Sequence, residues 1–244
     1  MSLLGEDAAV LCVGMSCQPA HVLRANIDLF RDLTGDQTLQ VSGMPFDWIL
    51  ADPLAVASWL RDMDAFPLQH EIQFRGPTPG KPWWPEKNLF FWHAFEREGR
   101  RFDDVPGTYH RVLAKHRYMV RKVRALSSLR RCICIVSNTQ GDLPALFRTT
   151  DSASAYVTAG QLLVLRQSID EVIGRDAELL FVTLPHLYGG GSTPRVTVLP
   201  RVADSVTDEW TGNQDHWVAV IRAYFEQAGA TLSENAERLL PISE

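Results

Sequence analysis

Short, continuous apolar runs recur along the chain and are typical of strands that are buried on both faces of a sheet. Three of them occupy Ala8–Val13, Cys132–Ser137 and Glu178–Leu184, and a shorter strand is predicted at Arg195–Leu199. Long connections separate these strands, which favours parallel pairing because parallel neighbours need long crossovers. The apolar positions therefore predict a sheet whose strands run mostly parallel.

Between the strands, apolar residues recur with the spacing of amphipathic helices. Asp52 is the expected N-cap of the second helix, with Pro53 at its first position. Alternating strands and helices predict an α/β fold in one domain, residues 1–244, as a three-layer sandwich with helices on both faces of the sheet. The helices are expected at Pro19–Asp32, Pro53–Met63, Thr108–Arg131 and Tyr156–Ile173, from Pro144, within Thr211–Gly229, and after a cap at Ser233.

The stretch from residue 66 to residue 98 departs from this regularity. It contains five prolines and a run of aromatic residues, and it is predicted to be an irregular insertion with a surface loop at Pro77–Pro85. A short strand at Leu89–Trp92 is expected to deliver His93 at its end.

Composition narrows the class of protein. A net charge of −5 gives no general attraction to nucleic acid, so no nucleic-acid partner is expected. No apolar run of about eighteen residues and no signal peptide is recognisable, so no membrane is expected either. The four cysteines fit neither a disulfide scaffold nor a zinc site. The run Gly189–Gly191 lacks the residues of a phosphate-binding loop. These features predict a reduced, cytoplasmic protein without metal or cofactor.

The turn between the first strand and the first helix carries a candidate nucleophile. Pro19 is expected at the first helical position, so Cys17 falls beside the helix N-terminus and just past a strand end. The partial positive charge of a helix N-terminus favours a thiolate and can lower the pKa of a cysteine. The alternative interpretation is a small apolar side chain buried in a tight turn.

Two further residues are candidates for acid–base chemistry. His93 could be a base that faces Cys17 across a cleft, or it could be a histidine of the core. Asp47, within Pro45–Trp48, could orient that histidine or accept the hydrogen bond of a local turn.

Residues predicted to contact a substrate lie beside these candidates or on the basic face of the long helix. Arginines that reach a cleft could bind an anionic group, aromatic side chains could wall a pocket, and turn N–H groups could bind an oxyanion. The predicted set comprises Ser16, Gln18, Trp48, Trp92, Arg117, Arg121 and Asn138.

Several of these segments match a known family in the same order along the chain. In them the chain resembles the bacterial DUF1796 family, which is described as papain-like cysteine peptidases. The resemblance implies that Cys17 is the nucleophile and His93 its base, with Asp47 as the candidate orienting carboxylate. The matching pieces are Val13–Ala20, Pro45–Trp48, His93–Phe95, Arg117–Arg124 and Trp210–Asn213 with Trp217.

The chain also departs from that family in two respects. Ala94 stands where the family has an aspartate after the histidine, and Val136-Ser137-Asn138 stands where the family has a basic strand end after its long helix. The opening strand is of the parallel type, which favours a Rossmann-like or SGNH-like sheet over the β-barrel that follows the cysteine helix in papain.

Three classes of function stay open. The first is thiol-dependent acyl chemistry, hydrolysis or transfer, on a peptide or another small acyl substrate. The second is an SGNH-like serine esterase that uses Ser16, Asn138 and His216, which occur in the chain order of such a sheet. The third is a non-catalytic protein that binds a ligand in its α/β cleft.

Overall fold

The structure is a computed structural model of the 244-residue chain. It describes residues 8–35, 37, 39, 43–76, 80–96, 103–126, 131–150, 154–174, 177–200 and 214–239. Two predicted segments lie outside the described residues. One is 210–213, which is part of the family resemblance and includes the start, 211–213, of the predicted C-terminal helical stretch. The other is the tip of the predicted loop, 77–79.

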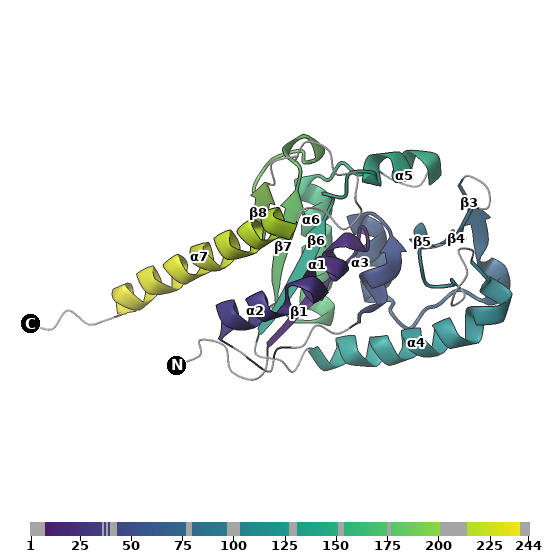
Figure 1. Cartoon of the computed structure of the whole chain (residues 1–244), viewed down its shortest axis with the longest axis horizontal. Helices are drawn as coiled ribbons and strands as arrows, with labels where there is room; N and C mark the ends of the chain where they lie inside the picture. Colours follow the sequence, from purple (N-terminus) through teal and green to yellow (C-terminus); the bar gives the residue numbers. More distant parts are fainter. Residues whose placement is uncertain are drawn as a thin grey trace, which may run out of the picture.

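A parallel sheet forms the centre of the molecule (Figure 1). Its four strands follow the order β1-β6-β7-β8, and every neighbouring pair is parallel. The predicted parallel sheet is therefore confirmed. The strands are β1 (Ala8–Cys12), β6 (Arg131–Ser137), β7 (Glu178–Thr183) and β8 (Val196–Pro200).

A second sheet is antiparallel and was not predicted from the sequence. It lies beside the parallel sheet and has the strand order β2-β5-β4-β3. Three of its strands fall in the stretch expected to be an irregular insertion, which therefore has regular structure in part. The strands are β2 (Ile49–Leu50), β3 (Gln73–Arg75), β4 (Lys81–Trp84) and β5 (Leu89–Phe91).

Helices pack against both faces of the parallel sheet. Alternate residues of β1 divide between two hydrophobic clusters, with Leu11 facing α3, α4 and α6, and Val10 facing α1, α2 and α7. The α-helices are α1 (Gln18–Ala25), α2 (Ile27–Thr34), α3 (Pro53–Arg61), α4 (Val105–Ala125), α5 (Leu143–Thr150), α6 (Ala159–Val172) and α7 (Gln214–Leu239). Short 3₁₀ helices occupy η1 (Pro45–Trp48), η2 (Gln69–Glu71) and η4 (Pro185–Leu187).

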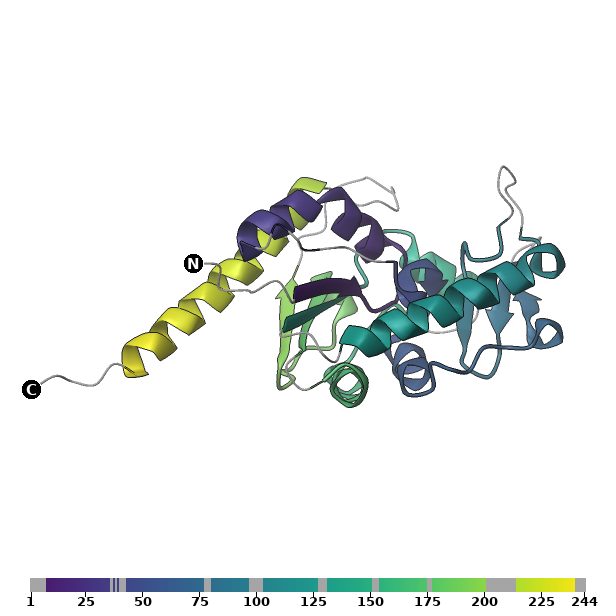
Figure 2. The same cartoon turned by 90° about the horizontal axis from the view of Figure 1, so that it is seen from below.

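One hydrophobic cluster joins the two sheets. It contains Leu11 of the parallel sheet together with Leu50 and Phe90 of the antiparallel sheet. Helix α4 runs along both sheets in the two perpendicular views (Figures 1 and 2). Trp59 belongs to this cluster, its side chain is 1 % exposed, and its ring stacks on His116 at a centroid distance of 5.3 Å. The shared cluster fixes the antiparallel sheet against the carboxyl edge of the parallel sheet, which is where ligands bind in α/β folds.

Two predicted elements differ from the structure in more than their boundaries. The predicted helix Pro19–Asp32 is two helices, because Asn26 interrupts it with a backbone φ of −118° and a side chain that donates to the Val22 carbonyl at 2.9 Å. The predicted loop Pro77–Pro85 contains β4, whose side chains alternate in burial despite Pro82. Proline is disfavoured in strands, so a strand that contains Pro82 was not expected.

Other differences concern boundaries. The helix predicted at Thr108–Arg131 begins earlier, after Asp104, whose carboxylate caps Gly107 N at 2.9 Å. It ends at Ala125, and Arg131 opens β6. Ser233 lies inside α7 and does not cap a separate helix. The predicted cap at Asp52 is confirmed, since its carboxylate accepts a hydrogen bond from Ala55 N at 2.8 Å.

Among the described helices, none combines the length and apolar composition needed to cross a membrane.

Candidate active site

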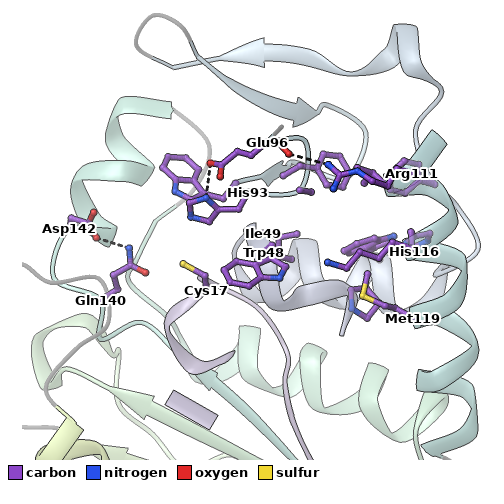
Figure 3. Close-up of a pocket in the computed structure, with 18 residues that line it drawn as sticks. Cys17, Trp48, Ile49, His93, Glu96, Arg111, His116, Met119, Gln140 and Asp142 are labelled. Carbon is purple, nitrogen blue, oxygen red and sulfur yellow. Dashed lines mark hydrogen bonds and ion pairs between the residues drawn. The ribbon is translucent and has the colours of Figure 1, made fainter. Parts of the chain in front are cut away.

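A cavity of about 650 Å³ opens between the start of α1, the antiparallel sheet and α4. Figure 3 shows side chains from all three parts of the chain converging on it. The sequence-predicted Cys17, His93, Trp48 and Trp92 all line this cavity. Other lining residues include Ile49, Glu96, Arg111, Lys115, His116, Met119, Gln140 and Asp142.

Cys17 is the residue that precedes α1, as predicted. The turn from β1 requires two residues with positive φ, Gly14 at 92° and Met15 at 69°. A Cβ on Gly14 would lie 2.5 Å from Val56 Cγ2, so a larger residue could not take this position without displacing Val56. The Met15 carbonyl accepts a hydrogen bond from Ala51 N at 3.4 Å. This tight turn presents Cys17 to the cavity at the carboxyl edge of the parallel sheet.

The Cys17 thiol is protonated at neutral pH in this setting. The residue is only 4 % exposed. Burial raises the pKa of Cys17 to about 11; a hydrogen bond from its own backbone N–H acts in the opposite direction, and the negative charge of Asp142 raises the pKa further. The expected lowering of the thiol pKa by the helix N-terminus is therefore wrong, because burial outweighs the partial charge at the start of a short helix.

The imidazole of His93 is oriented by Glu96. Nδ1 of His93 lies 2.7 Å from Oε1 of Glu96, and the two side chains are 36 % and 33 % exposed. Because a carboxylate only accepts, Nδ1 carries the proton and Nε2 is the basic nitrogen. The ring of Trp48 packs edge-on against the imidazole at a centroid distance of 5.6 Å. In Figure 3 Cys17 and His93 point toward each other, although no hydrogen bond joins these two described side chains.

Glu96 is the residue that sequence reasoning missed. Its only signal is its position three residues after His93, where the turn that follows β5 brings the two side chains together. Lys81 is shared between two carboxylates, so one net negative charge remains: its Nζ donates to Glu96 Oε1 at 3.3 Å, to Asp103 Oδ2 at 3.1 Å and to the Trp92 carbonyl at 3.0 Å. Strand β4, which was predicted to be a loop, therefore supplies the cation that pairs with the carboxylate beside His93.

Asp47 acts as the acceptor of a local turn, one of its two predicted roles. It is buried, and its carboxylate accepts from the Arg24 guanidinium and from Met44 N at 3.0 Å. Arg24 in turn lies over the Trp48 ring at 5.5 Å. None of the hydrogen bonds of Asp47 in the described chain reaches His93. Asp47 is connected to the site through Arg24, which lies over Trp48, and through its electrostatic interaction with Lys115.

Gln18 and Asn138 lie behind the cavity and do not line it. Oε1 of Gln18 accepts a hydrogen bond from Thr139 Oγ1 at 2.7 Å. Nδ2 of Asn138 donates to the carbonyls of Ala155 and Leu187 at 2.8 and 3.1 Å. These contacts hold the carboxyl end of β6 against α1 and the following loops, while Gln18 Nε2 and Asn138 Oδ1 are buried without a hydrogen-bond partner in the described chain. Their predicted contact with a substrate stays a prediction.

The basic residues of α4 divide between two cavities. Arg117 and Arg121, which were predicted to contact substrate, line a second cavity of about 340 Å³ that also includes Asp64. Arg111 and Lys115 line the cavity that holds Cys17. The basic helix therefore does reach the site, with a different pair of residues from the predicted one.

The alternative set Ser16, Asn138 and His216 does not line the cavity that holds Cys17. Ser16 is buried, and its Oγ accepts a long hydrogen bond from Gln18 N at 3.4 Å. His216 lies on α7, beside Trp217, which packs on the opposite face of the sheet from α4. Among the described residues, no group of three or more His, Cys, Asp or Glu side chains could hold a metal ion.

Comparisons of the chain with protein-family models, with curated proteins and with solved structures found no significant match. The resemblance to the DUF1796 family therefore stays a prediction.

Proposed function

We propose that the protein is a thiol-dependent acyl hydrolase or acyltransferase in which Cys17 is the nucleophile and His93 its base. The observation that carries this proposal is the convergence of Cys17 and His93 on one cavity from segments far apart in the chain. The Glu96–His93 hydrogen bond supports it further, because a base whose second nitrogen is held by a carboxylate has a defined tautomer and orientation.

The reaction begins with a protonated thiol. Nε2 of His93 removes the Cys17 proton as Sγ attacks the carbonyl carbon of the substrate and forms the S–C bond. When the tetrahedral intermediate collapses, the bond from carbon to the leaving group breaks and the imidazolium returns the proton to that group. Water or another acceptor then attacks the thioester and loses its proton to Nε2. The S–C bond breaks, and the imidazolium returns the proton to Sγ, which restores the Cys17 thiol. At the start of α1, Pro19 has no N–H and the Gln18 N–H already donates to Ser16 Oγ, so the Cys17 N–H beside the thiol is the proposed donor for the oxyanion.

Gln140 favours an amide as the substrate. Its Nε2 donates to Asp142 Oδ1 at 2.7 Å, and its Oε1 is buried without a hydrogen-bond partner. In Figure 3 this oxygen points toward Cys17. A buried acceptor gains a partner when a ligand brings an N–H group, and an amide substrate carries one whereas an ester does not.

Acetylation by p-nitrophenyl acetate tests the proposal. Intact-mass and peptide analysis should find one acetyl group on Cys17 after p-nitrophenolate is released, and none there in Cys17→Ala. His93→Ala should slow acetylation by about a hundredfold, which is the low end for loss of a general base. Ser16→Ala should leave the rate unchanged, since Ser16 is outside the cavity. Acetylation on Ser16, or none on Cys17 in the wild type, would overturn the proposal.

Glu96 is assigned as a positioning residue, and its own variants test that role. Glu96→Ala should slow acetylation at least about tenfold, whereas Glu96→Gln should retain part of the rate because the amide oxygen accepts the same hydrogen bond. In the His93→Ala background neither change should have a further effect. Glu86→Ala, an exposed glutamate outside the cavity, is the matched control.

A second candidate is a non-catalytic protein that binds an acyl ligand in the same cavity. The raised pKa of Cys17 favours it, because a protonated, buried thiol is typical of a structural cysteine. Two results together would establish this function instead. The wild type would never be acetylated, and Cys17→Ala would bind ligand with the same tryptophan fluorescence response as the wild type.

Two wider inferences accompany the proposal. The helices on both faces of the parallel sheet support the three-layer architecture. The four free, buried cysteines fit a reducing compartment such as the cytoplasm.

A further inference from the structure

The charges around the cavity are divided between its two ends. Near Cys17 the lining carries the carboxylates of Glu96 and Asp142. At the α4 end it carries the cations of Arg111 and Lys115. Figure 3 shows Cys17 and Arg111 on opposite sides of the cavity, with Trp48 and Ile49 between them.

The cations at the α4 end share one face of the helix. Arg111 and Lys115 are four residues apart, and Met119 follows after another four, so the three side chains lie on one helical stripe that lines the cavity. Arg111 is held at the rim because its Nη2 donates to the Glu96 carbonyl at 3.1 Å. In the described part of the chain, the ammonium group of Lys115 makes neither an ion pair nor a hydrogen bond, and its one recorded partner is the more distant charge of the buried Asp47.

The walls between the two ends are apolar. Trp48, Ile49, Phe66, Phe91 and Met119 contribute to them. A cavity of about 650 Å³ lies within the range of about 300–1,000 Å³ typical of sites for small organic ligands, which bind through such apolar walls and a few polar groups.

We infer that the substrate of this site is an acyl compound whose apolar acyl group ends in a carboxylate. The carboxylate binds Arg111 and Lys115, the apolar part lies against Trp48 and Phe91, and the acyl carbonyl reaches Cys17. The assignment rests on the proposed function for the reacting end, while the carboxylate end depends only on the charges of α4. The negative charge of Asp142 and Glu96 near Cys17 opposes binding in the reverse direction.

Binding to Cys17→Ala tests the inference without any reaction at the thiol. The probes are 4-phenylbutyrate and 4-phenylbutyramide, which differ in charge and hardly in shape, and the readout is the fluorescence of the cavity tryptophans. At low salt the carboxylate should bind about tenfold more tightly than the amide, which corresponds to about 1.4 kcal/mol. High salt should reduce the preference, because the two cations lie at the solvent-exposed rim.

Substitutions on α4 locate the preference. Arg111→Gln with Lys115→Gln should abolish it, and Arg117→Gln with Arg121→Gln, which removes the same charge from the other side of the helix, should preserve it. Circular dichroism checks that each exposed-site variant is folded. Equal binding of the two probes, no binding of either, or an equal loss in both double variants would overturn the inference. Acetylation of Cys17 is read separately in the wild type, so failure of the proposed function is distinguishable.

Discussion

Cys17 shows how two physical effects on one thiol compete. The start of a helix contributes a partial positive charge that stabilises a thiolate, but it acts over the first turn only. Burial removes the thiolate from water and is the largest influence here, so the pKa of Cys17 rises to about 11. A sequence shows that a cysteine precedes a helix, but its exposed fraction depends on the neighbouring elements.

Removing the charge of Asp142 should make Cys17 more reactive. Asp142→Asn eliminates a negative charge that raises the thiol pKa, while the amide oxygen still accepts the hydrogen bond from Gln140. We expect alkylation by iodoacetamide at pH 8 to accelerate about three- to tenfold, since one pKa unit is a tenfold change in thiolate. Peptide mass spectrometry over pH 6–10 measures the rate, with Cys12, Cys132 and Cys134 as internal references.

The matched control for this prediction is Asp28→Asn, an exposed carboxylate on α2 that pairs with Arg31 outside the cavity. It should leave the rate at Cys17 unchanged. If Asp142→Asn and Asp28→Asn behave alike, the charge of Asp142 has no part in the thiol pKa.

Asp47 should make stability depend on pH. Burial raises the pKa of Asp47, although the Met44 N–H and Arg24 act in the opposite direction, so the folded pKa lies above the ordinary value of 3.8. Its contribution to the free energy of unfolding is therefore fully present below pH 3.8 and is lost as pH rises through the folded pKa. Asp47→Asn lacks this loss, so its stability relative to the wild type should increase with pH.

Urea unfolding of both chains between pH 3.5 and 7 measures this difference, with Asp28→Asn as an exposed-carboxylate control. A wild type that gains stability over Asp47→Asn as pH rises would show that the Arg24 ion pair outweighs burial.

Among the secondary-structure elements, the turn from β1 to α1 depends on its packing against α3. Gly14→Ala would combine an unfavourable positive φ with a contact of 2.5 Å to Val56. We expect a loss of about 2–4 kcal/mol in the free energy of unfolding, because backbone strain and overpacking each cost about 1–3 kcal/mol. Chemical denaturation of the purified variant measures it.

A double variant separates the two causes. Val56→Ala removes the atoms that the new Cβ would meet, so Gly14→Ala with Val56→Ala should be more stable than the sum of the single losses predicts. Strictly additive losses would mean that strain alone, and not the contact with α3, requires glycine.

Elements that depend on local signals were predicted correctly, and those that depend on partners were not. The buried strands follow from apolar runs, and the Asp52 cap follows from a side chain that bonds three residues away. Strand β4 contains Pro82 and pairs with β3 and β5, so its existence depends on neighbours that the local pattern does not reveal. The break at Asn26 similarly involves Gln214, which is distant in the chain and accepts from Asn26 Nδ2 at 2.9 Å.

The candidate site divides in the same way. Cys17 and His93 could be predicted from the sequence, because their residue types and their positions at the ends of elements indicate a nucleophile and a base. The residues that complete the site are decided by orientation: Arg111 and Lys115 face the cavity while Arg117 and Arg121 face away from it, on the same helix. Helical spacing groups these residues into stripes, but only the contact of α4 with the two sheets determines which stripe lines the cavity.

At the scale of the whole molecule, one hydrophobic cluster spans both sheets, which predicts a single cooperative unfolding transition. Transitions in urea followed by circular dichroism and by tryptophan fluorescence should coincide. Leu11→Ala in the parallel sheet and Trp84→Ala in the antiparallel sheet, each costing about 2–5 kcal/mol, should shift both transitions together. Leu54→Ala, at an exposed position of α3, should shift neither by much. If Trp84→Ala moved the fluorescence transition alone, the antiparallel sheet would unfold independently, and the cavity between the sheets would open before the fold is lost.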